Sequence, residues 1–285
     1  MEAFLLEHEG EIILAAMVFG FVVVALAEST VPRRNITATL GWRWLNNLGL
    51  TLVSILAADW VKLALILSTA WWVDQQQFGL LQWWEPGAVA SLIVTFLVMD
   101  LTLYLYHRWM HRSPLLWRLH AVHHSDTEFD VTLTYRSHPL VVLVMALLRL
   151  PVVVALGAPL WALILYEAFG VLHDLFSHAN VRIPEKIERW LRYFIVTPDF
   201  HRLHHSSDRR YTDSNYGQNF PWFDHLFGTA RQRPFQDHES MEIGLERFRD
   251  RRDTRLDQML LMPFRGERFR APAPPRPIGA VVTTD

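Results

Sequence analysis

Histidines gather in three short clusters of the 285-residue sequence, and their spacing suits metal binding. His107 and His111 lie four residues apart, and residues four apart on an α-helix share one face. Two further clusters follow the pattern HxxHH, whose three histidines also share a helical face. These clusters are His120, His123 and His124, and then His201, His204 and His205. Imidazole nitrogen binds zinc, copper, iron and nickel, so the pattern indicates a transition-metal site.

The number of histidines favours two metal ions over one. The three clusters hold eight histidines, and His178, at the end of a later apolar stretch, makes nine. A single tetrahedral ion needs only four ligands. Two ions of five or six coordination could use all nine and keep room for oxygen or water. The sequence has no cysteine, which excludes thiolate-bound zinc, iron–sulfur clusters and disulfides. We expect the isolated histidines His8, His225 and His238 to be structural.

Apolar segments long enough for a membrane surround the first clusters. Apolar residues form 51 % of the chain and charged residues 20 %, against roughly 25 % charged in ordinary soluble domains. A spanning helix needs about 20 mostly apolar residues. Three segments meet or approach this length: 11–27, 45–73 and 87–106. Two shorter ones, 140–156 and 160–172, are separated by a tight break at 157–159 and form either spans or a hairpin that partly crosses.

Arginines in the connecting loops predict the orientation of these segments. Arg33 and Arg34 follow the first segment, and Arg108 and Arg112 follow the third, whereas residues 74–86 contain no Lys or Arg. Basic loop residues face the cytoplasm. We therefore expect an external N-terminus, with the histidines and the C-terminal half in the cytoplasm. A soluble bundle of buried helices is the alternative, and the one-sided arginines argue against it. The net charge of −2 gives no reason to expect nucleic acid as a partner.

Four stretches resemble the signature of the fatty acid hydroxylase / sterol desaturase superfamily and occur in the family's order. They are DLTLYLYHRWMHRSPLLWRLHAVHHSDTEFDVTLTYRSHPL, HDLFSHANVRIP, TPDFHRLHHS and NYGQNFPWFDHLFGT. The resemblance covers residues 87–229, about half of the chain. It implies a membrane-bound, O2-dependent enzyme with two iron ions, for which zinc could substitute, that hydroxylates or desaturates a C–H bond of a lipid. The fold it implies is an all-α membrane bundle of four or five segments with a cytoplasmic helical cap that holds the metals.

The resemblance also assigns residues. Nine histidines would bind the metals: His107, His111, His120, His123, His124, His178, His201, His204 and His205. His173 is a tenth candidate ligand, and His138 is expected to lie beside the metals or the substrate pocket without binding a metal. Independently of the resemblance, Asp100 and Tyr104 lie seven and three residues before His107 on its helix face, and Asp199 lies two before His201. All three are candidates to support metal-bound imidazoles, the aspartates because a carboxylate commonly accepts the second ring N–H. For both aspartates, a helix cap or an interfacial charge is the alternative.

The expected organisation and partners follow from these assignments. Residues 1–86 would form the N-terminal membrane helices, 87–230 the catalytic part, and 231–285 a cytoplasmic segment with a flexible, Pro-rich tail. We expect a multi-pass protein of a bacterial inner membrane, with a membrane lipid as substrate. A ferredoxin or cytochrome would supply electrons, because no cofactor motif for electron transfer is present. Sterol, fatty acyl chain, alkylglycerol and carotenoid all remain open as substrates. A histidine-rich metal transporter or sensor, a zinc hydrolase and an inactive relative are the alternative functions.

Overall fold

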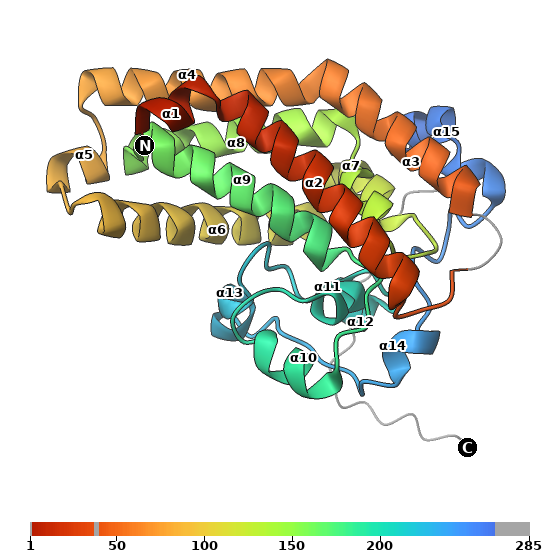
Figure 1. Cartoon of the computed structure of the whole chain (residues 1–285). Coiled ribbons are helices and arrows are strands. Elements are labelled where there is room, and N and C mark those ends of the chain that lie inside the picture. The colour runs from red at the N-terminus through yellow and green to blue at the C-terminus, as the bar shows by residue number, and fades with distance from the viewer. Residues whose placement is uncertain (1, 37–39, 266–285) are drawn as a thin grey trace.

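Helices joined by loops build the described structure, a computed structural model that covers residues 2–36 and 40–265 (Figure 1). Five helical segments are long and apolar enough to cross a membrane, so the expected all-α membrane fold is confirmed. They are Glu9–Thr30, Leu40–Trp84, Ala88–Arg112, Pro139–Leu156 and Leu160–Ser177. The Pro-rich segment 271–277 and the tail expected to be flexible lie outside the described residues.

The long helices form a bundle, and their order in the chain sets its layout. α2 (Glu9–Thr30) packs against α9 (Leu160–Ser177), and α4 (Trp60–Gln76) packs against α8 (Pro139–Leu156). α6 (Ala88–Arg112) contacts both α8 and α9. The short helices α1 (Glu2–Glu7) and α5 (Leu80–Trp84) lie at one end of the bundle, at the left of Figure 1.

Large apolar side chains cover the outside of this bundle. Phe19, Leu56 and Val89 are 69 %, 71 % and 73 % exposed, and each lies on one of the long helices. Extended apolar surface of this kind is unfavourable in water and mostly marks an interaction site, which for 18-residue or longer apolar helices is a lipid bilayer. The chain is therefore an integral membrane protein.

The second segment is longer than the sequence predicted. Its helix begins at Leu40 and not at Leu45, and runs through α3 (Leu40–Ser54), a π-helical turn (Ile55–Asp59) and α4. The start of this helix does not show in the apolar pattern of the sequence. The reason is that α3 buries polar groups, Arg43 and Asn47 among them, against other parts of the protein. This helix therefore reaches out of the bundle and helps to position the candidate site.

The break predicted between 156 and 160 is confirmed and joins two full helices of 18 residues each. Gly157 ends α8 in the left-handed region at φ +65°, and Gly79 has φ +104°. A Cβ on Gly79 would lie 2.5 Å from the Gly157 nitrogen. Both positions therefore need glycine, and their close approach ties the α4–α5 connection to the α8–α9 turn.

A cap of short helices lies at one end of the bundle (Figure 1). It comprises α7 (Pro114–His124), α10 (Glu185–Leu191), α11 (Pro198–His204), α12 (Arg209–Thr212), α13 (Trp222–Leu226), α14 (Asp237–Ser240) and α15 (Leu256–Leu261). Three 3₁₀ turns accompany them: Val131–Tyr135 lies between α7 and α8, Arg251–Thr254 between α14 and α15, and Met262–Phe264 after α15.

The two HxxHH sequences form helices with the same start. Ser113 caps α7 by accepting from the Leu116 N–H at 3.4 Å, and Thr197 caps α11 by accepting from the Phe200 N–H at 3.2 Å. A proline follows each cap as the first helical residue, where its missing N–H costs nothing. Each short helix is thereby begun at a fixed residue, which sets the direction in which its histidines point.

Candidate metal centre

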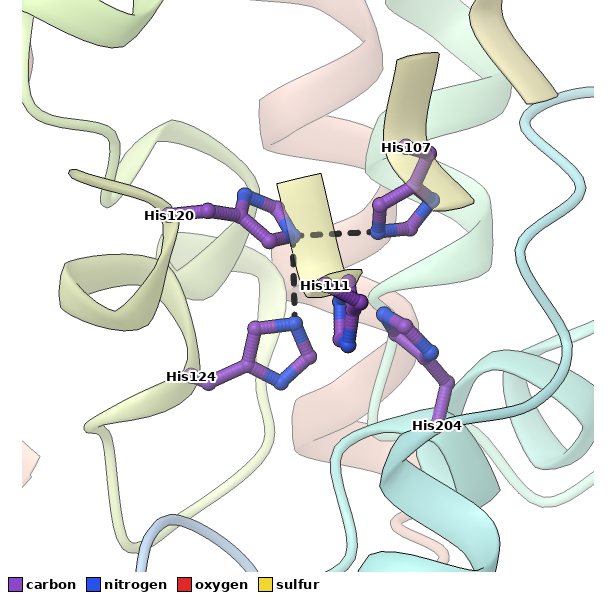
Figure 2. Close-up of side chains that lie close together, drawn as sticks. All are labelled: His107, His111, His120, His124 and His204. Atoms are coloured by element: carbon purple, nitrogen blue, oxygen red, sulfur yellow. Dashed lines mark hydrogen bonds between the residues drawn. The ribbon is translucent and has the colours of Figure 1, made fainter. Parts of the chain in front are cut away.

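Nine of the predicted histidines come together where α6, α7, α9 and α11 end, and all nine are buried. They form two groups whose candidate ligand atoms lie within 4.8 Å of one another. The five-histidine group is His107, His111, His120, His124 and His204 (Figure 2). The four-histidine group is His123, His178, His201 and His205.

Each HxxHH helix contributes to both groups. α7 places His120 and His124 in the five-histidine group and turns His123 toward the other. The short helix α11 does the reverse, because His204 joins the first group while His201 and His205 join the second. The HxxHH spacing therefore presents ligands to two neighbouring positions.

The Nε2 atoms within each group are spaced as nitrogens on one ion would be. His120 Nε2 lies 3.0 Å from His107 Nε2 and 3.2 Å from His124 Nε2. His201 Nε2 lies 3.0 Å from His178 Nε2 and 3.2 Å from His205 Nε2. Two nitrogens at right angles, each about 2.1 Å from a metal, would be about 3.0 Å apart, whereas tetrahedral ligands would be about 3.4 Å apart. The spacing fits ions with more than four ligands.

In three of the rings, a hydrogen bond at Nδ1 leaves Nε2 as an acceptor. Nδ1 of His107, His178 and His204 lies 2.9, 2.9 and 2.7 Å from the carbonyl oxygens of Tyr216, Asp174 and Ser214. A carbonyl only accepts, so Nδ1 carries the proton and Nε2 of the neutral ring offers a lone pair.

Neutral rings alone do not satisfy these contacts. His201 Nε2 has at most one proton and cannot direct it at both His178 and His205. Nε2 of His111 and of His204 is buried and has no hydrogen-bond partner among the described residues. A cation between the nitrogens would satisfy both arrangements, since lone pairs that would otherwise face one another become ligands.

Burial keeps the imidazoles neutral, which is the form that binds a metal. Burial, reinforced by the neighbouring imidazoles, holds the pKa values of His120, His124 and His204 well below the usual range. The same two causes lower the pKa values of His201 and His205. No proton therefore competes for these nitrogens near pH 7.

Asp213 is the one carboxylate that contacts either group in the described part of the chain. Its Oδ1 lies 3.2 Å from His111 Nδ1, and the two side chains are 13 % and 0 % exposed. The sequence interpretation did not find this residue, because it lies 102 positions from His111 and no helical spacing connects them.

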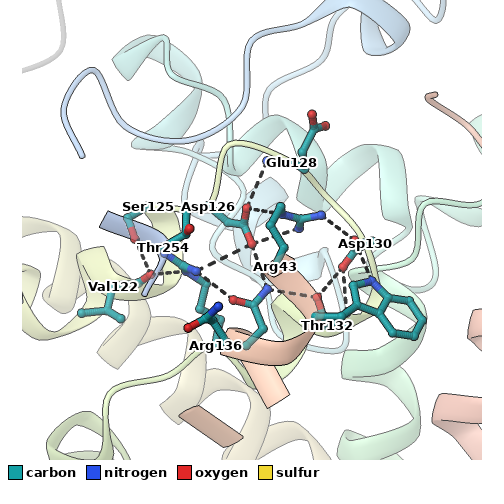
Figure 3. Close-up of polar contacts among 12 residues, drawn as sticks. Arg43, Val122, Ser125, Asp126, Glu128, Asp130, Thr132, Arg136 and Thr254 are labelled. Carbon is teal, nitrogen blue, oxygen red and sulfur yellow. Dashed lines mark hydrogen bonds and ion pairs between the residues drawn. The ribbon is translucent and has the colours of Figure 1, made fainter. Parts of the chain in front are cut away.

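A buried polar network contacts the C-terminal end of α7 and the turn that follows it (Figure 3). Arg136 donates to the Val122 carbonyl at 3.0 Å and to Ser125 Oγ at 2.8 Å, on either side of His123 and His124. Asp126 accepts from Arg43 Nε at 2.7 Å and so connects the same turn to α3. The sequence interpretation missed this network as well.

The predicted supporting residues have other partners. Asp100 accepts from the Asn219 N–H at 3.0 Å and the Phe220 N–H at 3.2 Å, and it lies two helical turns from His107. Tyr104 Oη lies 2.8 Å from Thr229 Oγ1. Both residues thus hold the loop 215–229, whose Tyr216 carbonyl contacts His107, and reach the histidines only through it.

Asp199 and His138 also have structural partners. Asp199 accepts from Arg33 and Arg202, which are both buried, and not from a histidine ring of either group. His138 caps α8, where its Nδ1 accepts from the Leu140 N–H at 3.2 Å and its Nε2 donates to the Leu260 carbonyl at 3.1 Å. It therefore joins α8 to the C-terminal part of the chain.

His173 lies outside both groups. It is buried on α9 and stacks on Phe169 with ring centroids 5.8 Å apart. Within residues 2–36 and 40–265, neither of its ring nitrogens has a hydrogen-bond partner. It lies five positions before His178, which is about 140° around a helix. The two rings therefore leave α9 in different directions.

A cavity of about 450 Å³ reaches the histidines from inside the bundle. His107, His120, His123, His178 and His201 form part of its wall. Apolar side chains of α2, α4 and α8 form much of the remainder, among them Leu14, Leu63 and Val142. An apolar chain held in the bundle could therefore reach both groups.

The comparison with known proteins agrees with this arrangement. The family model described as Fatty acid hydroxylase matches residues 92–229, which include all nine grouped histidines. The chain belongs to the fatty acid hydroxylase superfamily. The family expected from the sequence motifs is thus confirmed.

Several proteins with described activities are similar in sequence to part of this chain. An ornithine lipid hydroxylase of Rhizobium tropici is 34 % identical over 57 % of the chain and 48 % of its own length. Human alkylglycerol monooxygenase is 27 % identical over 55 % of the chain and 34 % of its own length. A very-long-chain aldehyde decarbonylase of Oryza sativa is 28 % identical over 58 % and 27 %. The chain thus spans about half or less of these relatives. No solved structure matches it.

Proposed function

We propose that this protein is a membrane-bound, O2-dependent oxygenase that uses two metal ions, expected to be iron, to hydroxylate a C–H bond of a lipid. The main support is that two groups of buried imidazoles meet the inner end of a largely apolar cavity. Relatives named a lipid hydroxylase and a monooxygenase favour oxygen insertion over desaturation. The catalytic part would be residues 87–230.

Two bound iron ions would supply the activation of O2, which takes two electrons from an external donor and two from the C–H bond. In balance, R–H, O2, two electrons and two protons give R–OH and water. The chain's own part is to bind and orient. Neutral imidazoles offer Nε2 to the metals, and the carbonyls of Tyr216, Asp174 and Ser214 fix the rings through Nδ1. The cavity walls hold the lipid and keep water away from the reacting bond.

The electrons would come from a separate protein such as a ferredoxin or a cytochrome. The chain contains no cysteine for an iron–sulfur cluster. Arg189 and Arg210 in the cap are 74 % and 60 % exposed, and such charges could attract an acidic donor. With the cap in the cytoplasm of a bacterial cell, this surface would face the donor.

Metal analysis and oxygen uptake test the proposal. We expect the purified protein to hold close to two irons per chain and to consume O2 when a chemical reductant and membrane lipid are added. Lipid extracted afterwards should be heavier by one oxygen atom, and the label should come from ¹⁸O2 and not from H2¹⁸O. A single bound zinc, with activity that needs no O2, would contradict the proposal and favour the hydrolase alternative.

A further inference from the structure

The wall of the cavity carries a polar strip that the histidine groups do not account for. Along α9, Glu167, Gly170, Val171 and Asp174 line the cavity before His178. Their spacings of three and four residues place them on one helical face. Glu167 lies eleven residues before His178, about 16 Å along the helix. Polar groups therefore extend from the histidines deep into the membrane bundle.

Several of these groups are already paired with one another. Glu167 forms an ion pair with Arg149 of α8, and Asp174 accepts from Gln218. Lys62 Nζ lies 3.2 Å from Asp59 Oδ1 at the cavity wall. Charged side chains inside a membrane are costly and mark functional sites when they face a cavity.

Two buried donors on this wall are left without a partner. Tyr135 Oη and Arg149 Nε make no hydrogen bond within the described residues, although both side chains line the cavity. Burial, with Asp174 and Asp59 nearby, raises the pKa of Tyr135, so its hydroxyl keeps its proton. A buried donor without an acceptor is unfavourable, and both donors would be satisfied by oxygen atoms of a ligand.

We propose that the cavity binds a lipid with ester, amide or hydroxyl oxygens that accept from Tyr135 and Arg149, and not a bare hydrocarbon. The same molecule would present a C–H bond to the histidine groups. This inference rests on the proposed function in that the bound lipid is the substrate, but it adds a substrate class. The alkyl part would fill the apolar portion of the cavity beside α2 and α4.

Binding of two probes of equal chain length tests this. Tritiated 1-hexadecanol and tritiated n-hexadecane would be titrated into nanodiscs that contain the metal-loaded protein. Since each probe's partition into the nanodisc lipid is the same for every variant, comparing variants isolates binding to the protein. We expect wild type to prefer the alcohol by about fivefold to tenfold, the value of one hydrogen bond from a buried donor.

Variants identify the donors. Tyr135→Phe removes only a hydroxyl that makes no hydrogen bond to the described part of the chain, and Arg149→Lys keeps the charge beside Glu167 but removes Nε. The double variant should reduce the preference to twofold or less, while Tyr193→Phe, at an exposed tyrosine outside the cavity, should leave it unchanged. Equal affinity of wild type for both probes, or a preference that survives the double variant, would overturn the inference. Binding needs no turnover, so absent oxygen uptake would count against the proposed function alone.

Discussion

Asp213 offers a direct test of the five-histidine group, because it contacts the group without belonging to it. Its Oδ1 lies 3.2 Å from His111 Nδ1, a contact that fixes which His111 nitrogen points at the other four rings. Hydrogen bonds to charged groups contribute about 1.5–3 kcal/mol, and strong ones are about 2.7–2.9 Å long. The longer distance here places the value near the lower limit, about 1.5 kcal/mol, which is roughly a tenfold change in affinity.

We therefore expect Asp213→Ala to weaken one of two bound metals by roughly tenfold. Asp213→Asn should lose less, about threefold, because the amide oxygen can still accept from Nδ1–H. The assay is a chelator titration followed by metal analysis of the protein. In Asp213→Ala, metal should be released in two separate steps as chelator is added. The step that belongs to the four-histidine group should occur at the same chelator concentration as in wild type. The control is Asp257→Ala, at an exposed aspartate of α15.

Two results would refute this reasoning. If Asp213→Ala holds both metals as tightly as wild type, the contact with His111 has no role in orienting the ring. If both metals are lost together in Asp213→Ala but not in Asp257→Ala, the two groups do not bind independently. Thermal unfolding of each variant would show whether a loss of metal reflects loss of the fold.

Three further outcomes are expected. Arg136→Met removes three buried hydrogen bonds and should cost about 3–5 kcal/mol, which would lower Tm in detergent by roughly 10 °C; an unchanged Tm would contradict this. His124→Ala should abolish lipid turnover, whereas His225→Ala, at an exposed ring, should retain it, and equal losses would count against the ligand assignment. Gly170→Leu fills cavity space, since a Cβ there meets nothing within 4 Å, and should reduce turnover more than tenfold with both metals kept. Gly41→Leu, equally open but outside the cavity, is its control and should turn over lipid normally.

The histidine clusters and the apolar segments could be read from the sequence because both are local patterns. Spacings of three and four residues determine helical faces, and a span is a run of apolar residues. The contact of His111 with Asp213 has no such pattern, since it joins positions 102 residues apart. The same holds for Arg43 and Asp126, which lie 83 residues apart in the network behind α7.

Helical geometry bears on the prediction for His173, which the resemblance to the superfamily suggested as a tenth ligand. An angle of about 140° between His173 and His178 around one helix separates the directions of their rings. His238 shows that the burial of an isolated histidine cannot be predicted from its sequence position. Its side chain is only 2 % exposed, and burial lowers its pKa to about 3. It is therefore a poor choice for a neutral control, and exposed His225 is better.

The cavity meets the two groups asymmetrically, which bears on where a lipid would react. Its wall includes His107 and His120 from one group and His123, His178 and His201 from the other. Of the remaining four, His111 and His124 pack against Trp117, with ring centroids 4.8 and 5.4 Å apart. A ligand in the cavity thus approaches both metal positions from one side. If the proposed function holds, we expect the reacting C–H bond to lie over the space between the two groups, within reach of the imidazoles that would hold the metals.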